Sequence, residues 1–213
     1  VTVGGELSLY SQGLETLRAQ RAYAPAVLAI TGTNGKTTVT SLTGQLIAHA
    51  GKTVAVAGNI GPTLLDTLTQ HLVADTLPEV WVLELSSFQL DGVSNFEPDA
   101  AVVLNISQDH LDWHGSMAAY AEAKSRIYGR RDTVMVINRD DPAVEAMVPP
   151  PEVIKSGVRG RPARTVHRRV VRFGLDAPQH PGDFGLVTQA GMAWLVRAQE
   201  ADPTIKLAKG EQH

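Results

Sequence analysis

Residues 32–38 read Gly-Thr-Asn-Gly-Lys-Thr-Thr, and the two segments beside them settle the class of fold. Before them, Ala26–Thr31 (AVLAIT) is a short apolar run with several β-branched residues, which is typical of a buried strand. After them, Lys36–Ala50 predicts a helix, which Gly51 would end as a C-cap. The apolar face expected for this helix consists of Val39, Leu42, Leu46, Ile47 and Ala50. A strand, a glycine-containing turn and a helix in this order predict a loop that binds phosphate.

The chemistry of this loop supports the same interpretation. Gly32 and Gly35 let backbone N–H groups turn towards an anion, and the start of the helix adds partial positive charge. Lys36 can lie between the terminal phosphates of a nucleotide, and the hydroxyl of Thr37 can bind Mg²⁺. The candidate nucleotide-binding residues are Gly32, Thr33, Asn34, Gly35, Lys36, Thr37 and Thr38. Ile30 stands where the strict motif has its first glycine, so the loop is a shortened variant; a glycine turn followed by a chance lysine is the alternative.

The alternation of apolar runs with amphipathic stretches extends to about residue 148. Further strands are expected at Thr53–Ala57, Val80–Leu85, Ala100–Leu104 and Thr133–Ile137. Further helices are expected near Pro62–Leu68, at Ser116–Tyr128 with Ser116 as N-cap, and at Pro142–Met147. Continuous apolar strands alternating with helices predict a doubly wound, mostly parallel sheet of the α/β class.

The character of the chain changes after Val148. A triple proline, Pro149–Pro151, precedes the arginine-rich stretch Arg159–Arg169, which is either a phosphate patch or a solvated loop. Leu186–Thr188 and Met192–Arg197 predict a hairpin, so we expect a small antiparallel appendage at the edge of the sheet. The chain therefore divides into a lead-in over residues 1–25, a parallel α/β core over 26–148, and a linker with a small antiparallel sheet over 149–213.

Composition excludes several classes of protein. The chain has 213 residues and a formal net charge of −3, which argues against a strongly basic nucleic-acid binder. It has no cysteine, so a disulfide framework, a thiolate metal site and a cysteine nucleophile are excluded. It contains no apolar run long enough for a membrane-spanning helix and does not open with a signal peptide, so a cytoplasmic protein is expected. Its first residue, Val1, suggests a piece of a longer chain.

Polar residues with useful chemistry stand at the predicted strand ends, where ligands of open α/β sheets bind. Glu84 lies in an apolar strand, so its carboxylate needs either Mg²⁺ or a buried salt bridge. His110 is either a ligand or a structural residue, and Asp109 and Asp112 beside it suit a turn as well as a site. Asn59 lies between two glycines, in either a ligand-binding turn or a plain one.

Four segments together resemble the Mur ligases. They are GTNGKTT (32–38), AGNIGPTLLDTL (57–68), LELSSFQL (83–90) and NISQDHLDWHGSMAAYAEAK (105–124). LELSSFQL is similar to the members that add D-glutamate, and differs from members that add other residues and from folylpolyglutamate synthetases. The likeness is close over residues 1–140 and loose beyond them. It implies that ATP phosphorylates the carboxylate of UDP-MurNAc-L-alanine and that the amine of D-glutamate displaces the phosphate, in the synthesis of a peptidoglycan precursor.

The resemblance also implies roles for individual residues. Lys36 would contact the ATP phosphates, and Thr37 and Glu84 would hold the first of two Mg²⁺ ions. His110 would help to hold the second ion together with Lys124, which the family carbamylates. By its sequence alone, Lys124 looks like a surface lysine on a helix. Asn59, Ser86 and His110 would face UDP-MurNAc-L-alanine.

The family has three domains, and the resemblance identifies this chain with the central one. It implies that residues 1–25 are a linker and lead-in helix and that residues 26–148 are the ATP-binding core. The N-terminal UDP-binding domain and the C-terminal domain would be absent, so the chain by itself is expected to have no ligase turnover. The expected partners are the small molecules UDP-MurNAc-L-alanine and D-glutamate, with no nucleic acid and no membrane, and the expected state is a monomer. Two alternatives stay open: a nucleotide-binding module without ligase activity, and a related Mur or folylpolyglutamate-type ligase with another amino-acid substrate.

Overall fold

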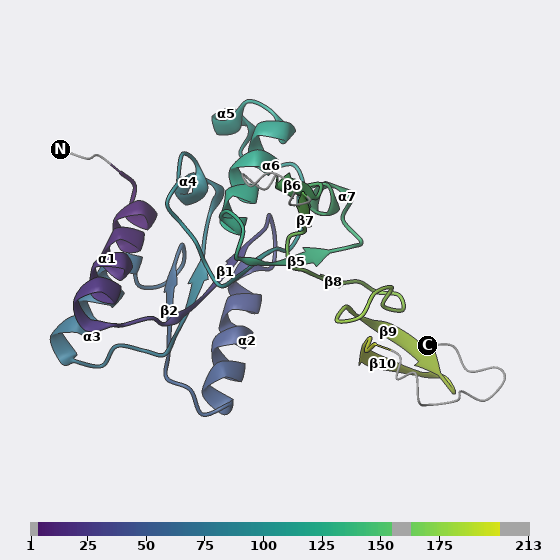
Figure 1. Cartoon of the computed structure of the whole chain (residues 1–213), viewed down its shortest axis with the longest axis horizontal. Coiled ribbons are helices and arrows are strands. Elements are labelled where there is room, and N and C mark those ends of the chain that lie inside the picture. Colours follow the sequence, from purple (N-terminus) through teal and green to yellow (C-terminus); the bar gives the residue numbers. More distant parts are fainter. Residues whose placement is uncertain (1–3, 155–162, 201–213) are drawn as a thin grey trace.

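The computed structural model describes residues 4–154 and 163–200, which form one large sheet with helices on both faces (Figure 1). The strands of this sheet are β1 (Ala26–Thr31), β2 (Val54–Gly58), β3 (Val80–Glu84), β4 (Ala100–Val103), β5 (Val134–Asn138), β8 (Val170–Phe173), β9 (Phe184–Gln189) and β10 (Met192–Arg197). The helices are α1 (Glu6–Arg21), α2 (Lys36–His49), α3 (Leu64–Ala74), α4 (Ser87–Leu90), α5 (Leu111–His114), α6 (Met117–Ser125), the 3-10 turn η1 (Arg126–Tyr128) and α7 (Pro142–Glu145). A separate two-stranded ribbon pairs β6 (Glu152–Ile154) with β7 (Arg164–Val166).

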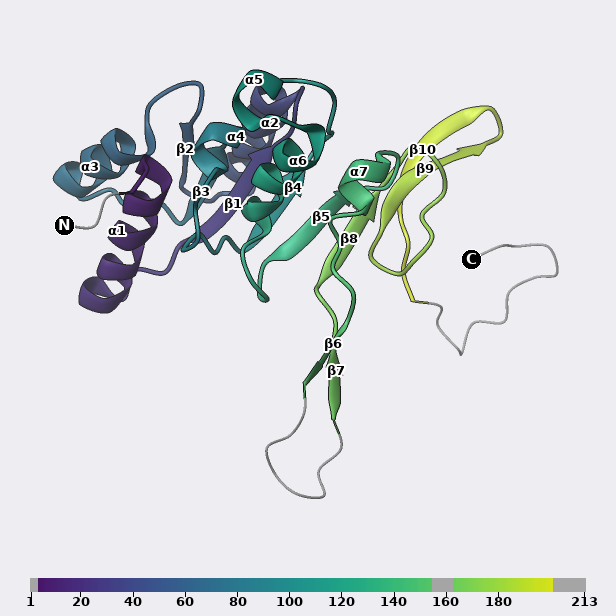
Figure 2. The same ribbon diagram turned by 90° about the horizontal axis from the view of Figure 1, so that it is seen from above.

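The strand order is β10-β9-β8-β5-β4-β1-β3-β2, and every pair from β2 to β8 is parallel. The expected doubly wound, mostly parallel α/β fold is therefore confirmed. The antiparallel hairpin of β9 and β10 is also present, and it joins β8 through the single pair Phe173–Phe184. Figure 2 shows the hairpin on the side of β8 opposite to β5, away from α1 and α3.

The two faces of the sheet bury different side chains. Under α1 and α3, Trp81 is fully buried and meets the ring of Tyr10 edge-on at 5.4 Å. On the other face, Val39 and Ile47 of α2 pack on a group of aliphatic side chains that includes Val82. With both faces covered, the central strands are apolar except at their carboxyl ends, where β1 ends in Thr31 and β3 in Glu84.

The buried face of α2 differs from the prediction. Leu42 and Leu46, expected to be buried, are 52% and 70% exposed, while Thr40 and Gly44 face the sheet. The helix lies so close to β2 that a Cβ atom on Gly44 would be 2.7 Å from Cγ2 of Val56. This close approach turns the small residues inwards and leaves the leucines outside.

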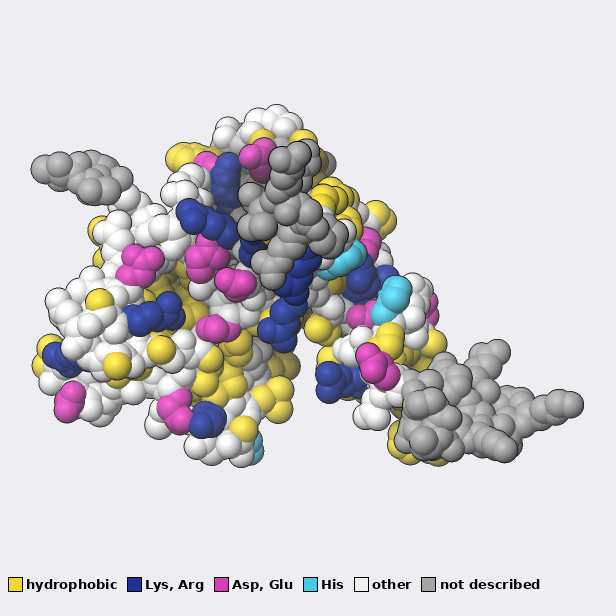
Figure 3. All heavy atoms as spheres, viewed as in Figure 1, with side chains coloured by type: hydrophobic (Ala, Val, Ile, Leu, Met, Phe, Trp, Pro, Cys, Tyr) yellow, Lys and Arg dark blue, Asp and Glu magenta, His cyan; other side chains and the backbone are white. Residues whose placement is uncertain are grey.

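Part of the arginine-rich stretch is anchored. Arg168 donates from Nη2 to the carbonyl oxygen of Tyr128 at 2.6 Å, which ties the segment before β8 to η1. Arg159 and Arg161 lie outside the described residues, as do residues 206–213, and the phosphate patch stays a prediction. On the face drawn in Figure 3, basic and acidic side chains lie next to one another. Among the described residues, no helix combines the length and apolar character that crossing a membrane requires.

Candidate active site

The predicted phosphate loop connects β1 to α2 at the carboxyl edge of the sheet. Gly32 has φ +154° and Gly35 has φ +82°, so both use backbone conformations that favour glycine. A Cβ atom on Gly32 would lie 2.9 Å from Cβ of Leu104, so the loop also needs glycine for its close approach to β4. Asn105 braces the loop: its Oδ1 accepts from the backbone N–H of Asn34 at 2.9 Å and its Nδ2 donates to the Asn34 carbonyl at 3.1 Å.

Two lysines donate to one carbonyl oxygen of this loop. Lys36 Nζ lies 3.1 Å from the Gly32 oxygen and 3.0 Å from the Thr33 oxygen. Lys124 Nζ lies 3.0 Å from the same Gly32 oxygen and 3.2 Å from Oγ1 of Thr31. The structure therefore brings Lys124 to the phosphate loop from a helix more than 90 residues away in sequence.

Lys124 is 2% exposed, so its interpretation as a surface lysine is wrong. Burial, followed by repulsion from Lys36, lowers the pKa of Lys124 to about 7, although Asp109 opposes this shift. Near neutral pH a large share of this side chain is therefore the uncharged amine, which is the nucleophilic form of lysine.

Glu84 ends β3 between Ile30 of β1 and Gly58 of β2, and it is 2% exposed. Oε1 of Glu84 accepts from Nδ2 of Asn59 at 3.3 Å, and within residues 4–154 and 163–200 no cation pairs with this carboxylate. The alternative of a buried salt bridge is therefore not what these residues form. Glu84 and Thr37 line one cavity of about 370 Å³ beside the loop.

The strand junction beside Glu84 depends on a glycine. Gly58 has φ +133°, and a Cβ atom there would lie 2.0 Å from the carbonyl oxygen of Glu84. That oxygen accepts from the backbone N–H of Asn59 at 2.8 Å. The absence of a side chain at Gly58 thus allows Asn59 to hold both the backbone and the carboxylate of Glu84.

His110 approaches Lys124 through contacts between aromatic rings. It precedes α5 as the N-cap residue, with φ +50°, and its Nε2 lies 3.4 Å from Oδ2 of Asp109. Its ring centroid lies 4.8 Å from that of Phe88 and 6.5 Å from that of Tyr120. The face of the Tyr120 ring lies in turn 4.8 Å from Nζ of Lys124. His110 thus borders the lysine site, with Tyr120 between them.

Ser86 caps the short helix α4. Its Oγ accepts from the backbone N–H of Gln89 at 3.3 Å, and its own N–H donates to Oε1 of Gln89 at 2.9 Å. This capping box explains the local turn after Glu84. Contact of Ser86, Asn59 and His110 with a substrate stays a prediction, as does the part that Asp109 and Asp112 play.

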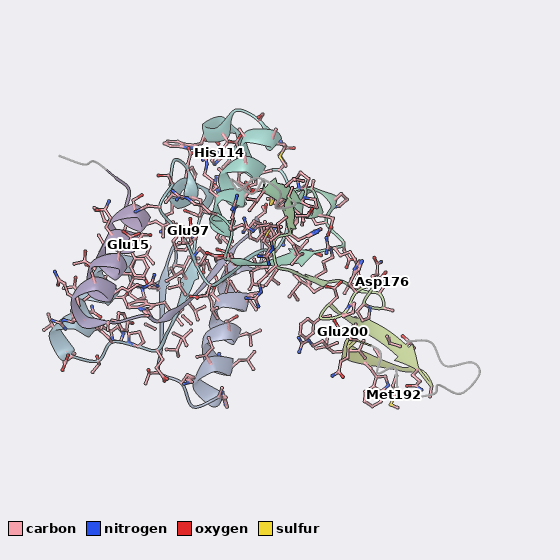
Figure 4. The ribbon with its side chains drawn as sticks, in the orientation of Figure 1. Glu15, Glu97, His114, Asp176, Met192 and Glu200 are labelled. Carbon is pink, nitrogen blue, oxygen red and sulfur yellow. The ribbon has the colours of Figure 1, made fainter. Side chains whose placement is uncertain are left out.

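Tyr120 and Asn105 belong to the site, although the sequence analysis gave neither of them a role. Tyr120 lies four residues before Lys124 on α6, a spacing that places both on one helix face. That spacing was a usable signal, whereas the contact of Asn105 with the loop required the fold. His114 also borders this site, because the centroid of its ring lies 5.4 Å from that of Tyr120. Figure 4 labels His114 near the end of α5, far from Asp176, Met192 and Glu200 around the hairpin.

The donors at this edge suit Mg²⁺ in part. A hydroxyl and a carboxylate, from Thr37 and Glu84, are hard oxygen ligands, and Mg²⁺ commonly completes its shell with phosphate oxygens and water. Within the described ranges there is no group of three or more His, Asp or Glu side chains that would form a protein-only metal site. A second ion near Lys124 would require its ammonium to be replaced by an anionic group.

A larger cavity, of about 580 Å³, lies at the opposite edge of the sheet, between α1 and the starts of β1, β4 and β5. Its lining includes Tyr10, Arg18, Asp99, Arg130 and Thr133. Although this cavity has the larger volume, it is the weaker candidate for the active site, because the phosphate loop and both lysines lie at the carboxyl edge of the sheet.

The chain is similar to known proteins along most of its length. Residues 30–175 match the family described as Mur ligase middle domain. The chain is 62% identical over 207 residues to the UDP-N-acetylmuramoylalanine–D-glutamate ligase of Albidiferax ferrireducens, covering 97% of this chain and 40% of that protein. It is 55% identical over 202 residues to the ligase of the same name from Burkholderia thailandensis, covering 95% and 38%. The chain thus spans about two fifths of the length of these relatives.

Solved structures share the fold. A structure of UDP-N-acetylmuramoyl-L-alanyl-D-glutamate–2,6-diaminopimelate ligase superposes with a TM-score of 0.61 at 28% identity, covering 86% of this chain and 38% of that one. The MurF ligase of Thermotoga maritima in complex with ADP has a TM-score of 0.59 at 19% identity, covering 93% and 46%. At that identity the second likeness concerns the fold alone.

Proposed function

The chain belongs to the Mur ligase middle domain family, and from this premise we propose that it is the ATP-binding part of a ligase that joins D-glutamate to UDP-MurNAc-L-alanine. The likeness to D-glutamate ligases along nearly the whole chain carries the choice of substrate. The reaction would serve peptidoglycan synthesis in the cytoplasm. The regions that bind UDP and D-glutamate would lie outside this chain, and its own parts would be residues 1–25, 26–148 and 149–213, in a monomeric enzyme.

In this proposal the loop from Gly32 to Thr38 binds the phosphates of ATP. Backbone N–H groups and the start of α2 supply partial positive charge, and Lys36 moves from its present carbonyl partners to the phosphate oxygens. Thr37 and Glu84 would hold the first Mg²⁺, which supplies charge neutralisation for phosphoryl transfer when it is bound.

Lys124 would act as a carbamate. The neutral amine nitrogen attacks the carbon of CO₂; a C–N bond forms as one C–O π bond opens onto oxygen, and the nitrogen releases one proton, so the neutral side chain becomes an anion. The pKa of about 7 supports this step because it supplies the neutral amine at physiological pH. The carbamate and His110 would then be the protein groups that hold a second Mg²⁺.

The remaining chemistry is acyl transfer. The γ-phosphoryl group of ATP passes to the carboxylate of UDP-MurNAc-L-alanine. The amine of D-glutamate then attacks the carbonyl carbon and inorganic phosphate leaves. Asn59, Ser86 and His110 would face the first substrate. The reaction brings anions together, so positioning and charge neutralisation are the main work of these side chains.

The test of substrate choice uses the full-length protein that contains this chain. Phosphate release is measured with UDP-MurNAc-L-alanine, ATP and one amino component at a time. We expect release with D-glutamate and none with L-lysine, D-alanyl-D-alanine or L-alanine. Release with one of the other three would favour the related-ligase alternative and overturn the proposed substrate.

A second experiment separates a ligase from a nucleotide-binding module. In the full-length protein, Lys124→Ala should abolish phosphate release, and a short carboxylic acid should restore part of it. Lys52→Ala is the matched control, because Lys52 is an exposed lysine paired with Glu79. Wild-type turnover in Lys124→Ala would contradict the role given to Lys124.

A further inference from the structure

Tyr120 lies between the phosphate loop and the lysine of α6, although neither the loop motif nor the proposed chemistry accounts for it. It is 1% exposed. Its hydroxyl oxygen lies 3.1 Å from Oγ1 of Thr33 in the loop, and Nζ of Lys124 lies over its ring, 4.8 Å from the ring centroid. One side chain therefore contacts both elements that the proposed function brings together.

The hydrogen bonds of Thr33 determine the direction of this contact. Oγ1 of Thr33 donates to the carbonyl of Ser107 at 3.2 Å and accepts from the backbone N–H of Ser107 at 3.0 Å. A hydroxyl has one proton, so the Tyr120 hydroxyl donates to Thr33. Burial raises the pKa of Tyr120, which keeps this donor protonated.

Thr33 is held from three directions as a result. Its backbone N–H donates to the Asn105 carbonyl at 3.0 Å, its side chain is bonded to Ser107, and Tyr120 fixes it from α6. The carbonyl of Thr33 is also one of the two partners of Lys36. A shift of Thr33 would therefore displace the ammonium group that meets the nucleotide.

We propose that Tyr120 is a positioning residue whose hydroxyl, acting through Thr33, holds the phosphate loop in the conformation that receives ATP. This rests on the proposed function only in taking ATP as the ligand of the loop. The ring packs under Lys124 whether or not the hydroxyl is present, so Tyr120→Phe removes the hydrogen bond and leaves the aromatic contact.

The test is a double-mutant cycle between Tyr120→Phe and Thr33→Val. Affinity for Mg-ATP is measured by NMR titration of the 213-residue chain, which reaches millimolar dissociation constants. We expect Tyr120→Phe to weaken binding about fivefold. Thr33→Val should weaken it more, because the N–H of Ser107 then also loses its acceptor. Adding Tyr120→Phe to Thr33→Val should have no further effect.

Tyr23→Phe is the matched control. It removes a hydroxyl that accepts from Nε1 of Trp81 and donates to the carbonyl of Pro78, remote from the loop. Its ATP affinity should equal that of the wild type. A Tyr120→Phe variant that binds ATP as tightly as the control, or a cycle that is additive, would overturn the proposal. Should Tyr120→Phe fail to fold, Thr33→Val compared with Thr33→Ser tests the Thr33 hydroxyl that Tyr120 and Ser107 both contact: only the Ser variant should retain affinity, and equal affinity in the two variants would overturn the proposal.

A second readout does not need ATP. Hydrogen exchange at the backbone amides of Thr33 and Asn34, measured without nucleotide, should be about fivefold faster in Tyr120→Phe and unchanged in Tyr23→Phe. A wild-type chain that fails to bind ATP would contradict the proposed function. The exchange rates would then decide whether Tyr120 holds the loop, since unchanged rates in Tyr120→Phe would refute that separately.

Discussion

Lys124 shows how tertiary structure changes the chemistry of one residue. Within α6 its sequence context is that of a solvent-facing lysine, and no local pattern predicts burial. The fold brings it to Thr31 and Gly32 across 93 and 92 residues of sequence. Its lowered pKa follows from that placement, so the family resemblance, rather than spacing, was the part of the sequence analysis that identified it.

The buried amine predicts a dependence of stability on pH. The pKa of Lys124 is about 7 in the folded chain against 10.5 as the ordinary value, so between these pH values the unfolded chain binds more protons. The free energy of unfolding should therefore rise with pH from 7 to 10.5 on account of this group, and its cost is full below pH 7. Lys124→Met should be more stable than the wild type at pH 6.5.

Urea unfolding in bicarbonate-free buffer measures this difference. The advantage of Lys124→Met should shrink steadily as the pH approaches 10. Lys52→Met is the control, because Lys52 is exposed and its substitution should give no such trend. A constant difference between Lys124→Met and the wild type at all pH values would contradict the assigned pKa.

At the scale of elements, the junction between β2 and β3 positions Glu84. The sequence predicted both strands and placed Asn59 at the turn, but not the close backbone contact that fixes them. Gly58→Ala would put a Cβ atom 2.0 Å from a backbone oxygen in addition to its positive φ. We expect a loss of about 3 kcal/mol in the free energy of unfolding.

Gly61→Ala provides a matched comparison. Gly61 also has positive φ, +114°, but no heavy atom lies within 4 Å of a Cβ atom placed there. It should lose only about 1 kcal/mol, the cost of the backbone conformation. Equal losses at the two positions, measured by denaturant unfolding, would show that the contact with Glu84 does not restrain this junction.

The helix α2 shows where pattern reasoning stops. Its bounds were predicted to within one residue, because a glycine-containing loop precedes it and Gly51 follows it. Its buried face was not predicted correctly, because Gly44 brings the helix against Val56 and the leucines point outwards. A residue without a side chain gives no signal in a count of apolar positions, although it decides the packing distance.

At the scale of the whole molecule, we expect the parallel sheet to contribute more to the free energy of unfolding than the hairpin does. Trp81 is 0% exposed at the centre of the larger core, whereas Trp194 of β10 is 50% exposed. Trp81→Ala should cost about 3–5 kcal/mol of unfolding free energy. Trp194→Ala should cost less than about 1 kcal/mol, because its side chain is half exposed and it is paired across the hairpin with Val187. Similar losses in thermal or urea unfolding would mean that the hairpin is part of the cooperative core.

The class of fold was predictable because the central strands are mainly apolar and most of them are followed by a helical pattern. The pairing of the strands after residue 148 was less predictable. β8 was not anticipated as a strand beside β5, and the hairpin attaches to β8 by one residue pair. Short strands with mixed exposure leave a weak pattern, since their partners rather than their own sequence select the pairing.

The central claim is that ATP binds at the carboxyl edge of the sheet, where the phosphate loop, Glu84 and Lys124 converge, and not in the larger cavity at the opposite edge. Chemical-shift mapping of the ¹⁵N-labelled chain with Mg-ATP tests it directly. We predict shifts at residues 32–38, Glu84 and Lys124 that disappear in Lys36→Ala. Shifts confined to Tyr10, Asp99 and Thr133, which line the opposite cavity, or no shifts at millimolar Mg-ATP, would contradict it.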